Sequence, residues 1–117
     1  MAEYLIAFQD EWVPELTEDD LRAASTRVRA LRKEMTDAGV LIFTGGLDQD
    51  QPVFSVDATG GSPVVTDGPF VETKEHLGGL CIVDVPDAAA AREWAAKVAV
   101  ACGWPQEVRP FQVVRRD

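Results

Sequence analysis

Residues 64–85, VVTDGPFVETKEHLGGLCIVDV, decide the fold because two apolar strand-like runs enclose a polar centre. The first run ends at a tight corner that begins with Asp67 and Gly68. A charged run over residues 72–76 follows, and the glycine pair Gly78-Gly79 leads into the second run. Most of the candidate polar chemistry of the chain therefore lies between two strands of one sheet.

The chain has the size and composition of a single globular domain over residues 1–117. It has 46% hydrophobic and 26% charged residues, which is ordinary for a globular protein. No apolar run reaches the roughly 18 residues that a membrane-spanning helix needs. The first residues lack the basic start and apolar core of a signal peptide. We therefore expect no membrane association and a cytoplasmic location.

The formal net charge of −9, from 11 basic and 20 acidic residues, bears on the partners of the chain. Nucleic-acid binding requires lysine and arginine to displace counterions from phosphates. The acidic balance therefore predicts no nucleic-acid partner. It favours a solvated surface, and it also allows a protein partner of basic charge.

Metal and cofactor chemistry has little support in the sequence. Cys81 and Cys102 sit in apolar segments without a CxxC spacing, so we predict two reduced core thiols. Glu72 and His76 would share one face of a helical turn, but two ligands are too few for a metal site. Gly78-Gly79 is no phosphate loop, because GxxxxGK[ST] is missing, and close backbone packing explains it better. We expect neither metal nor cofactor.

The first helix has the clearest local signals. Thr17 is a good N-cap, and acidic residues occupy the first turn, as the helix dipole prefers. Gly39 provides the left-handed residue that ends the helix. The spacing of apolar residues predicts one buried stripe, made of Leu21, Ala24, Val28, Leu31, Met35 and Ala38.

The remaining elements alternate with this helix. Asp87 is the predicted N-cap of a second helix with a buried stripe that includes Trp94, and Gly103 ends it. Gly45-Gly46 is expected to stop the second strand, and residues 58–61 to join a hairpin. The predicted strands cover residues 4–8, 40–43, 52–56, 63–66, 79–85 and 108–114.

This order, β-α-β, a hairpin insertion and then β-α-β, predicts an α+β fold, a ferredoxin-like sandwich with two helices on one face of an antiparallel sheet. Residues 5–8 and 80–83 are apolar at successive positions, so both faces of the sheet require burial. Two helices cover only one face. A homodimer that packs sheet against sheet is the economical way to cover the other.

With DGPF, ETKE and LGG placed between two strands, the chain resembles the YCII-related proteins and, within them, the DGPF-domain branch. The likeness extends over nearly the whole length. It implies a dimeric α+β barrel and a bacterial cytoplasmic protein of unassigned activity. Some DGPF proteins are suspected of acting with extracytoplasmic-function sigma factors.

Another branch of the family has been proposed to use an Asp–His pair in its cleft. This chain keeps the aspartate as Asp10, at the end of the first strand. The first helix contains no histidine, and Val28 stands at the matching position. Chemistry that depends on the pair is therefore not carried over.

Six residues are candidates for a site in a cleft. Asp10, Asp67 and His76 are the predicted catalytic groups, and Phe70, Glu72 and Lys74 the predicted substrate-binding groups. Each also has a structural explanation. Asp67 suits a turn before Gly68, Phe70 would anchor the corner against the sheet, and the charged run would form a salt-bridged loop.

Two functions follow. In one, the protein binds or converts a small molecule in a cleft formed on dimerisation, as similar barrels do, although fold alone does not establish a reaction. In the other, it is a non-catalytic accessory protein that contacts a regulatory partner, such as an extracytoplasmic-function sigma factor, through its acidic surface. Enclosed polar groups around a pocket favour the first, and charges that all face water favour the second.

Overall fold

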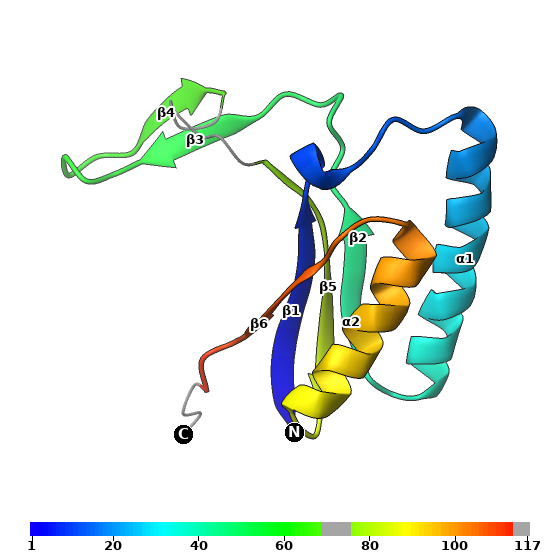
Figure 1. Cartoon of the computed structure of the whole chain (residues 1–117). Coiled ribbons are helices and arrows are strands. Elements are labelled where there is room, and N and C mark those ends of the chain that lie inside the picture. The colour runs from blue at the N-terminus through cyan, green and yellow to red at the C-terminus, as the bar shows by residue number, and fades with distance from the viewer. Residues whose placement is uncertain (69–75, 114–117) are drawn as a thin grey trace.

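The computed structural model describes residues 1–68 and 76–113, and these form a mixed α+β fold (Figure 1). A four-stranded antiparallel sheet carries two helices, and a separate two-stranded hairpin is inserted in the chain. In chain order the elements are β1 (Ala2–Gln9), η1 (Asp10–Trp12), α1 (Glu18–Asp37), β2 (Leu41–Gly46), β3 (Phe54–Asp57), β4 (Val64–Asp67), β5 (Leu77–Val85), α2 (Ala88–Cys102) and β6 (Glu107–Pro110).

Helix α1 begins and ends at the residues that the sequence predicted. The Thr17 hydroxyl accepts a hydrogen bond from the Asp20 backbone N–H at 3.1 Å, and the Asp20 carboxylate accepts one from the Thr17 N–H at 3.1 Å. This reciprocal capping satisfies two donors that the first turn leaves free. Gly39 has a φ of 74°, the left-handed conformation expected just after the helix.

Helix α2 is capped in the same local way. Asp87 accepts a hydrogen bond from the Ala90 N–H at 2.9 Å, and Gly103 adopts a left-handed φ of 96° at the other end. Two polar contacts between described residues join α2 to α1. The Arg27 Nε donates to the Ala101 carbonyl at 3.0 Å, and Lys97 pairs with Glu34 at 2.5 Å. The first of these also satisfies a carbonyl in the last turn of α2.

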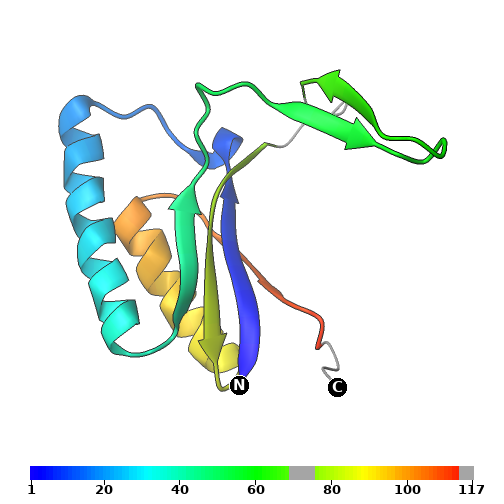
Figure 2. The ribbon, with the colours of Figure 1, turned by 180° about the vertical axis from the view of Figure 1, so that it is seen from behind.

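The strand order in the main sheet is β2-β5-β1-β6, with β5 antiparallel to both of its neighbours. Ile6 of β1 faces Cys81 of β5, and Val108 of β6 faces Ile6 from the other side. Both helices lie on one face of this sheet (Figures 1 and 2). The order and the layers are consistent with the predicted ferredoxin-like arrangement.

The core lies between the helices and the sheet. Ile6, Val83 and Val85 are fully buried there, together with Met35 of α1. Alanines at three- and four-residue spacing bring α2 close to the strands, because a small side chain lets the backbones approach. These alanines, with the valine that continues the stripe, are Ala91, Ala95, Val98 and Ala101.

The predicted stripe of α1 is buried only in part. Ala24 and Met35 are buried, whereas Leu21 is 52% exposed and Val28 is exposed as well. Near Leu21 and Val28, α1 therefore does not pack fully against the sheet. In α2, Trp94 of the predicted stripe is half-buried.

The opposite face of the sheet carries apolar side chains too. Leu5 faces Ile82, and Ile82 also faces Phe43 of β2. Phe43 is 58% exposed. In the described ranges, no helix covers this face (Figures 1 and 2). The two helices thus leave one sheet face uncovered. The sequence predicted this, because both faces of the strands are apolar and two helices cover only one.

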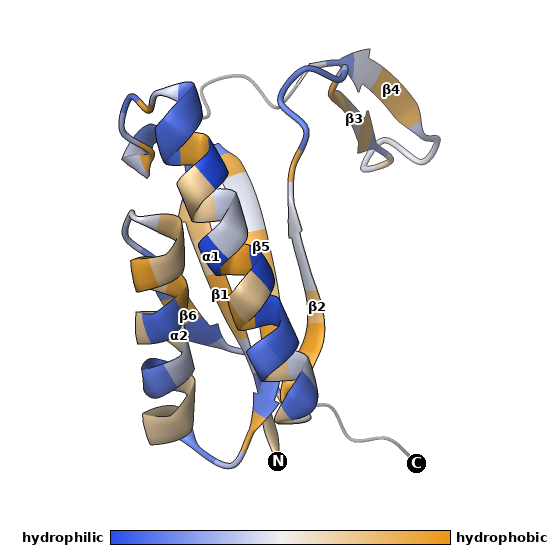
Figure 3. Cartoon of the chain, turned by 90° about the vertical axis from the view of Figure 1, so that its right-hand side faces the viewer, coloured by the Kyte–Doolittle hydropathy of each residue, from blue (hydrophilic) through white to orange (hydrophobic). Residues whose placement is uncertain are grey.

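The β3–β4 hairpin projects beyond the end of the main sheet, away from the helices (Figure 1). Its hydrophobic bands stand clear of the body in the view coloured by hydropathy (Figure 3). Phe54 is 63% exposed, and Val56 and Val65, which face one another across the hairpin, are exposed too. A two-stranded ribbon is marginal by itself, so this arm requires further packing to be stable.

Several strand boundaries differ from the sequence prediction. β3 begins at Phe54 rather than at residue 52, β5 begins at Leu77 rather than at residue 79, and β6 ends at Pro110, before the predicted end at residue 114. Gly45 and Gly46 do not stop β2; they pair with Leu80 and Gly79 of β5. At Gly45 the Phe43 ring occupies the space beside the strand, whereas nothing lies within 4 Å of a Cβ atom placed on Gly46. None of the described helices is long and apolar enough to cross a membrane.

Candidate functional site

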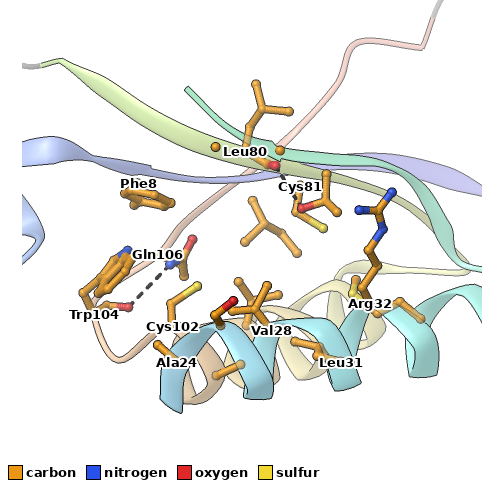
Figure 4. Close-up of a pocket in the computed structure, with 18 of the residues that line it drawn as sticks. Phe8, Ala24, Val28, Leu31, Arg32, Leu80, Cys81, Cys102, Trp104 and Gln106 are labelled. Atoms are coloured by element: carbon orange, nitrogen blue, oxygen red, sulfur yellow. Dashed lines mark hydrogen bonds between the residues drawn. The ribbon is translucent and has the colours of Figure 1, made fainter. Parts of the chain in front are cut away.

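The incomplete closure of α1 leaves an apolar cavity of about 400 Å³ between the helices and the sheet (Figure 4). Ala24, Val28 and Leu31 of α1 form one wall. The sheet forms the opposite wall with Ile6, Phe8 and Cys81, and the end of α2 contributes Val98, Ala101 and Cys102. An apolar void of this size is well above the water-sized gaps of a packed core.

Aromatic and polar groups close one end of the cavity. Phe8 and Trp104 pack edge to face, with ring centroids 5.3 Å apart at 67°. Gln106 lies beside them, and its amide donates to the Trp104 carbonyl at 3.5 Å. The Trp104 Nε1 is buried and has no hydrogen-bond partner among the residues that the structure describes. A buried donor without an acceptor is uncommon in native proteins and requires an explanation.

Arg32 stands at the other end, and its guanidinium extends from α1 toward the sheet (Figure 4). Arg32 is exposed, so it lies at the rim where the cavity meets solvent. In the sheet wall, the Thr44 hydroxyl donates to the Leu80 carbonyl at 3.2 Å. The cavity lining is therefore mostly apolar, with Arg32 at one end and Trp104 and Gln106 at the other.

The two cysteines lie in the walls of this cavity. Both are free, Cys81 buried and Cys102 half-buried, as the sequence predicted. Burial raises the pKa of both thiols, because a thiolate loses hydration in apolar surroundings. These are protonated packing groups rather than nucleophiles.

The Gly78-Gly79 pair positions Asp10 next to the aromatic end of the cavity. A Cβ atom on Gly78 would fall 2.5 Å from the Phe8 ring and 2.6 Å from the Asp10 Oδ1. On Gly79 it would fall 2.8 Å from the same ring. The glycines are thus required by close packing, as predicted. Asp10 is half-buried beside Phe8 but does not line the cavity.

His76 pairs with Glu11, a residue that the sequence analysis did not select. The His76 Nδ1 and the Glu11 Oε1 share a hydrogen bond, and the His76 backbone N–H donates to Glu11 Oε2 at 3.2 Å. The Asp10 N–H donates to the His76 carbonyl at 2.7 Å. The bond from His76 lowers the pKa of Glu11. The only sequence signal was the position of Glu11 next to Asp10 at a strand end.

Asp67 lies elsewhere, at the end of β4 in the projecting hairpin, and is exposed. Gly68, the residue directly after it, makes two hydrogen bonds with the facing strand region. Gly68, with a φ of 90°, donates to the Val53 carbonyl at 2.6 Å, and the Ser55 hydroxyl donates to the Gly68 carbonyl at 2.8 Å. The structure therefore brings His76 and Asp10 together, but places Asp67 in a separate sheet.

The predicted substrate-binding residues lie outside the described ranges, namely Phe70, Glu72 and Lys74. Where side chains are described, no group of three histidines, cysteines or carboxylates could hold a metal ion.

The family model of the YCII-related domain matches residues 3–108. The chain belongs to the YCII-related family. None of the curated proteins matches the sequence. In this YCII-related protein, Val28 lines the cavity from α1. The position that the resemblance assigned to a histidine is therefore an apolar wall residue here, so Asp10 has no histidine on α1 to pair with.

Proposed function

We propose that this YCII-related protein binds a small, mainly apolar molecule in the cavity between α1, α2 and the sheet. One observation carries the proposal: the cavity measures about 400 Å³ and its lining is almost wholly apolar. Small-molecule sites typically measure roughly 300–1,000 Å³, with apolar walls and a few polar groups that orient the ligand. An apolar cavity of about 150 Å³ already binds benzene.

Packing energetics supports an occupant. Atoms that line a void lose dispersion contacts on one side, so an empty cavity is destabilising. Leu21 and Val28 would leave water if a ligand filled the space beside them. A bound apolar molecule supplies the contacts that the packing of α1 leaves unmade.

The proposal is binding rather than a particular reaction. The described lining holds no carboxylate and no histidine, and so has no ordinary general acid or base. Asp10, Glu11 and His76 lie beyond the Phe8 end. Catalytic roles for Asp10, Asp67 and His76 stay predictions, as does substrate binding by Phe70, Glu72 and Lys74.

A blocked cavity tests the proposal. Neutral naphthol is titrated against the wild type and against Val28→Trp, whose indole would fill the space. The matched control is Val100→Trp, the same exchange at an exposed position of α2. A ligand at 100 times its Kd raises the free energy of unfolding by about 2.7 kcal/mol, which a thermal melt detects.

We expect naphthol to raise the melting temperature of the wild type and of Val100→Trp, and to leave Val28→Trp unchanged. Equal shifts in all three proteins would place binding elsewhere and reject this cavity as the site.

We also propose that two copies of the chain associate through the uncovered sheet face, as a dimeric α+β barrel of the DGPF branch. Phe43, Ile42 and Ile82 on and beside that face support this. Such a dimer would bury apolar surface that a monomer leaves in water.

An accessory role with a transcription regulator, such as an extracytoplasmic-function sigma factor, is the second candidate. The projecting hairpin favours it, because exposed Phe54, Val56 and Val65 form an apolar surface on an acidic protein. Substitution of Phe54 by Ser would then abolish co-purification with a regulator and leave naphthol binding unchanged.

A further inference from the structure

The charge of the cavity lining identifies the chemical class of its ligand, if the proposed binding function holds. The chain has 20 acidic and 11 basic residues. Yet Arg32 is the one charged residue among the described residues that line the cavity. The described lining contains no carboxylate, although acidic residues outnumber basic residues in the chain. The site is therefore complementary to an anion and not to a cation.

The guanidinium of Arg32 is available for a ligand. Several other basic side chains are engaged within the described chain: Arg22 with Asp19, Lys33 with Asp37, Lys97 with Glu34, Arg109 with Glu107, Arg27 with the Ala101 carbonyl and Arg29 with the Ser25 hydroxyl. Arg32 makes no such side-chain contact with any described residue. Its planar fork matches a carboxylate, which accepts two parallel hydrogen bonds.

The far end of the cavity offers a second donor. The Trp104 Nε1 is buried and finds no acceptor within residues 1–68 and 76–113, and the edge-to-face contact with Phe8 holds the indole in place. Indole nitrogen only donates, so its partner must be an acceptor such as a hydroxyl or carbonyl oxygen. Between Arg32 and Trp104 the walls are apolar, with Val28 and Leu31 along α1 (Figure 4).

We propose that the ligand is an apolar carboxylic acid with a second oxygen at its far end. The carboxylate accepts hydrogen bonds from Arg32 at the rim. The hydrocarbon part lies against Val28 and Leu31, and the distal oxygen accepts a hydrogen bond from the Trp104 Nε1. This orientation leaves the charge near solvent and buries the apolar part. It therefore has a lower desolvation cost than an orientation that buries the carboxylate.

Three probes with one ring system separate these contacts. Hydroxynaphthoate carries both the carboxylate and the distal hydroxyl, naphthoate lacks the distal hydroxyl, and naphthol lacks the carboxylate. Affinities are measured by calorimetry on the wild type, Arg32→Gln and Trp104→Phe. The matched control is Arg29→Gln, which removes the same charge from the same helix outside the lining.

We expect both acids to bind at least tenfold more tightly than naphthol. Arg32→Gln abolishes this preference and Arg29→Gln keeps it. Trp104→Phe abolishes the preference of hydroxynaphthoate over naphthoate. In nitrogen–proton NMR spectra, the indole N–H signal that disappears in Trp104→Phe should move when hydroxynaphthoate binds.

Two results would overturn the inference in different ways. If naphthol binds as tightly as the acids, or if Arg32→Gln keeps the acid preference, the cavity binds apolar molecules without selecting acids, and the proposed function survives. If none of the probes binds the wild type, the proposed function fails and the acid-binding site fails with it.

Discussion

The ring of Phe8 lies where a side chain at position 78 would begin, because a Cβ atom on Gly78 would fall 2.5 Å from the Phe8 Cε2. The Asp10 Oδ1 would be 2.6 Å from that added Cβ atom. The pairing of β1 with β5 thus requires glycine at positions 78 and 79, where the Phe8 ring closes the cavity. The register shift between Phe8 and Gln9 occurs at this point.

Gly78→Ala should destabilise the fold, because Phe8 must move away from its place against Trp104. Overpacking in a well-packed region typically costs about 1–3 kcal/mol. Gly46→Ala is the matched control, since it also lies in a strand but has nothing within 4 Å of the added methyl group. Urea denaturation should show a loss only for Gly78→Ala. Equal midpoints for both variants would contradict the packing found here.

The Glu11–His76 contact should make stability depend on pH. Hydrogen bonding to His76 holds the pKa of folded Glu11 below its ordinary 4.5. A carboxyl group with a lowered folded pKa stabilises the fold fully above its unfolded pKa. That contribution is lost as the pH falls through the folded value.

The urea midpoint of the wild type should therefore exceed that of Glu11→Gln at about pH 6, and the gap should close as acid is added. Glu15→Gln, an equal charge change in the adjoining exposed loop, is the control. A gap that stays constant down to about pH 3 would show that Glu11 acts without its charge.

Both thiols should react slowly with a disulfide exchange reagent in the folded protein, because burial raises the pKa of each. Cys81 is 4% exposed and should be the slower, as a comparison of Cys81→Ser with Cys102→Ser will show. Naphthol should slow both reactions further if it fills the cavity. A Cys81 that reacts equally fast with and without urea would contradict the buried position.

The proposed sheet-to-sheet dimer predicts a mass of roughly twice 12.7 kDa by light scattering. Phe43→Asp should shift the mass to that of the monomer while circular dichroism stays unchanged, because Phe43 is exposed on the uncovered face. Val100→Asp, at an exposed position on α2, should remain dimeric. A wild type that is monomeric at micromolar concentration would remove the dimer and any cleft between its copies.

The candidate site was less predictable than the fold. Val28, Cys81 and Cys102 were expected as core residues, and the structure adds that all three line a cavity. Their apolar character was correct. A cavity, however, is a difference between the volume enclosed and the volume filled, and a hydrophobic pattern reports neither. The role of Trp104 was not predictable either, because the burial of its indole nitrogen becomes known only with its surroundings.

The pairing of His76 was also beyond the sequence. The resemblance directed attention to a histidine on the first helix, and this chain has none there. The strand pairing of β1 with β5 brings His76 to Glu11 across a separation of 65 residues. Such contacts depend on strand register, which propensity does not determine.

The sequence by itself determined the ends of both helices and the apolar strands between them. Thr17 with Asp20, and Asp87 with Ala90, make hydrogen bonds over three residues, so the local sequence contains both partners. Tertiary structure alone decided which strands are neighbours, how far α1 stands from the sheet and which donors face the cavity. Those features arise from packing between distant segments, where the balance of many small contacts, and not any short motif, selects the arrangement.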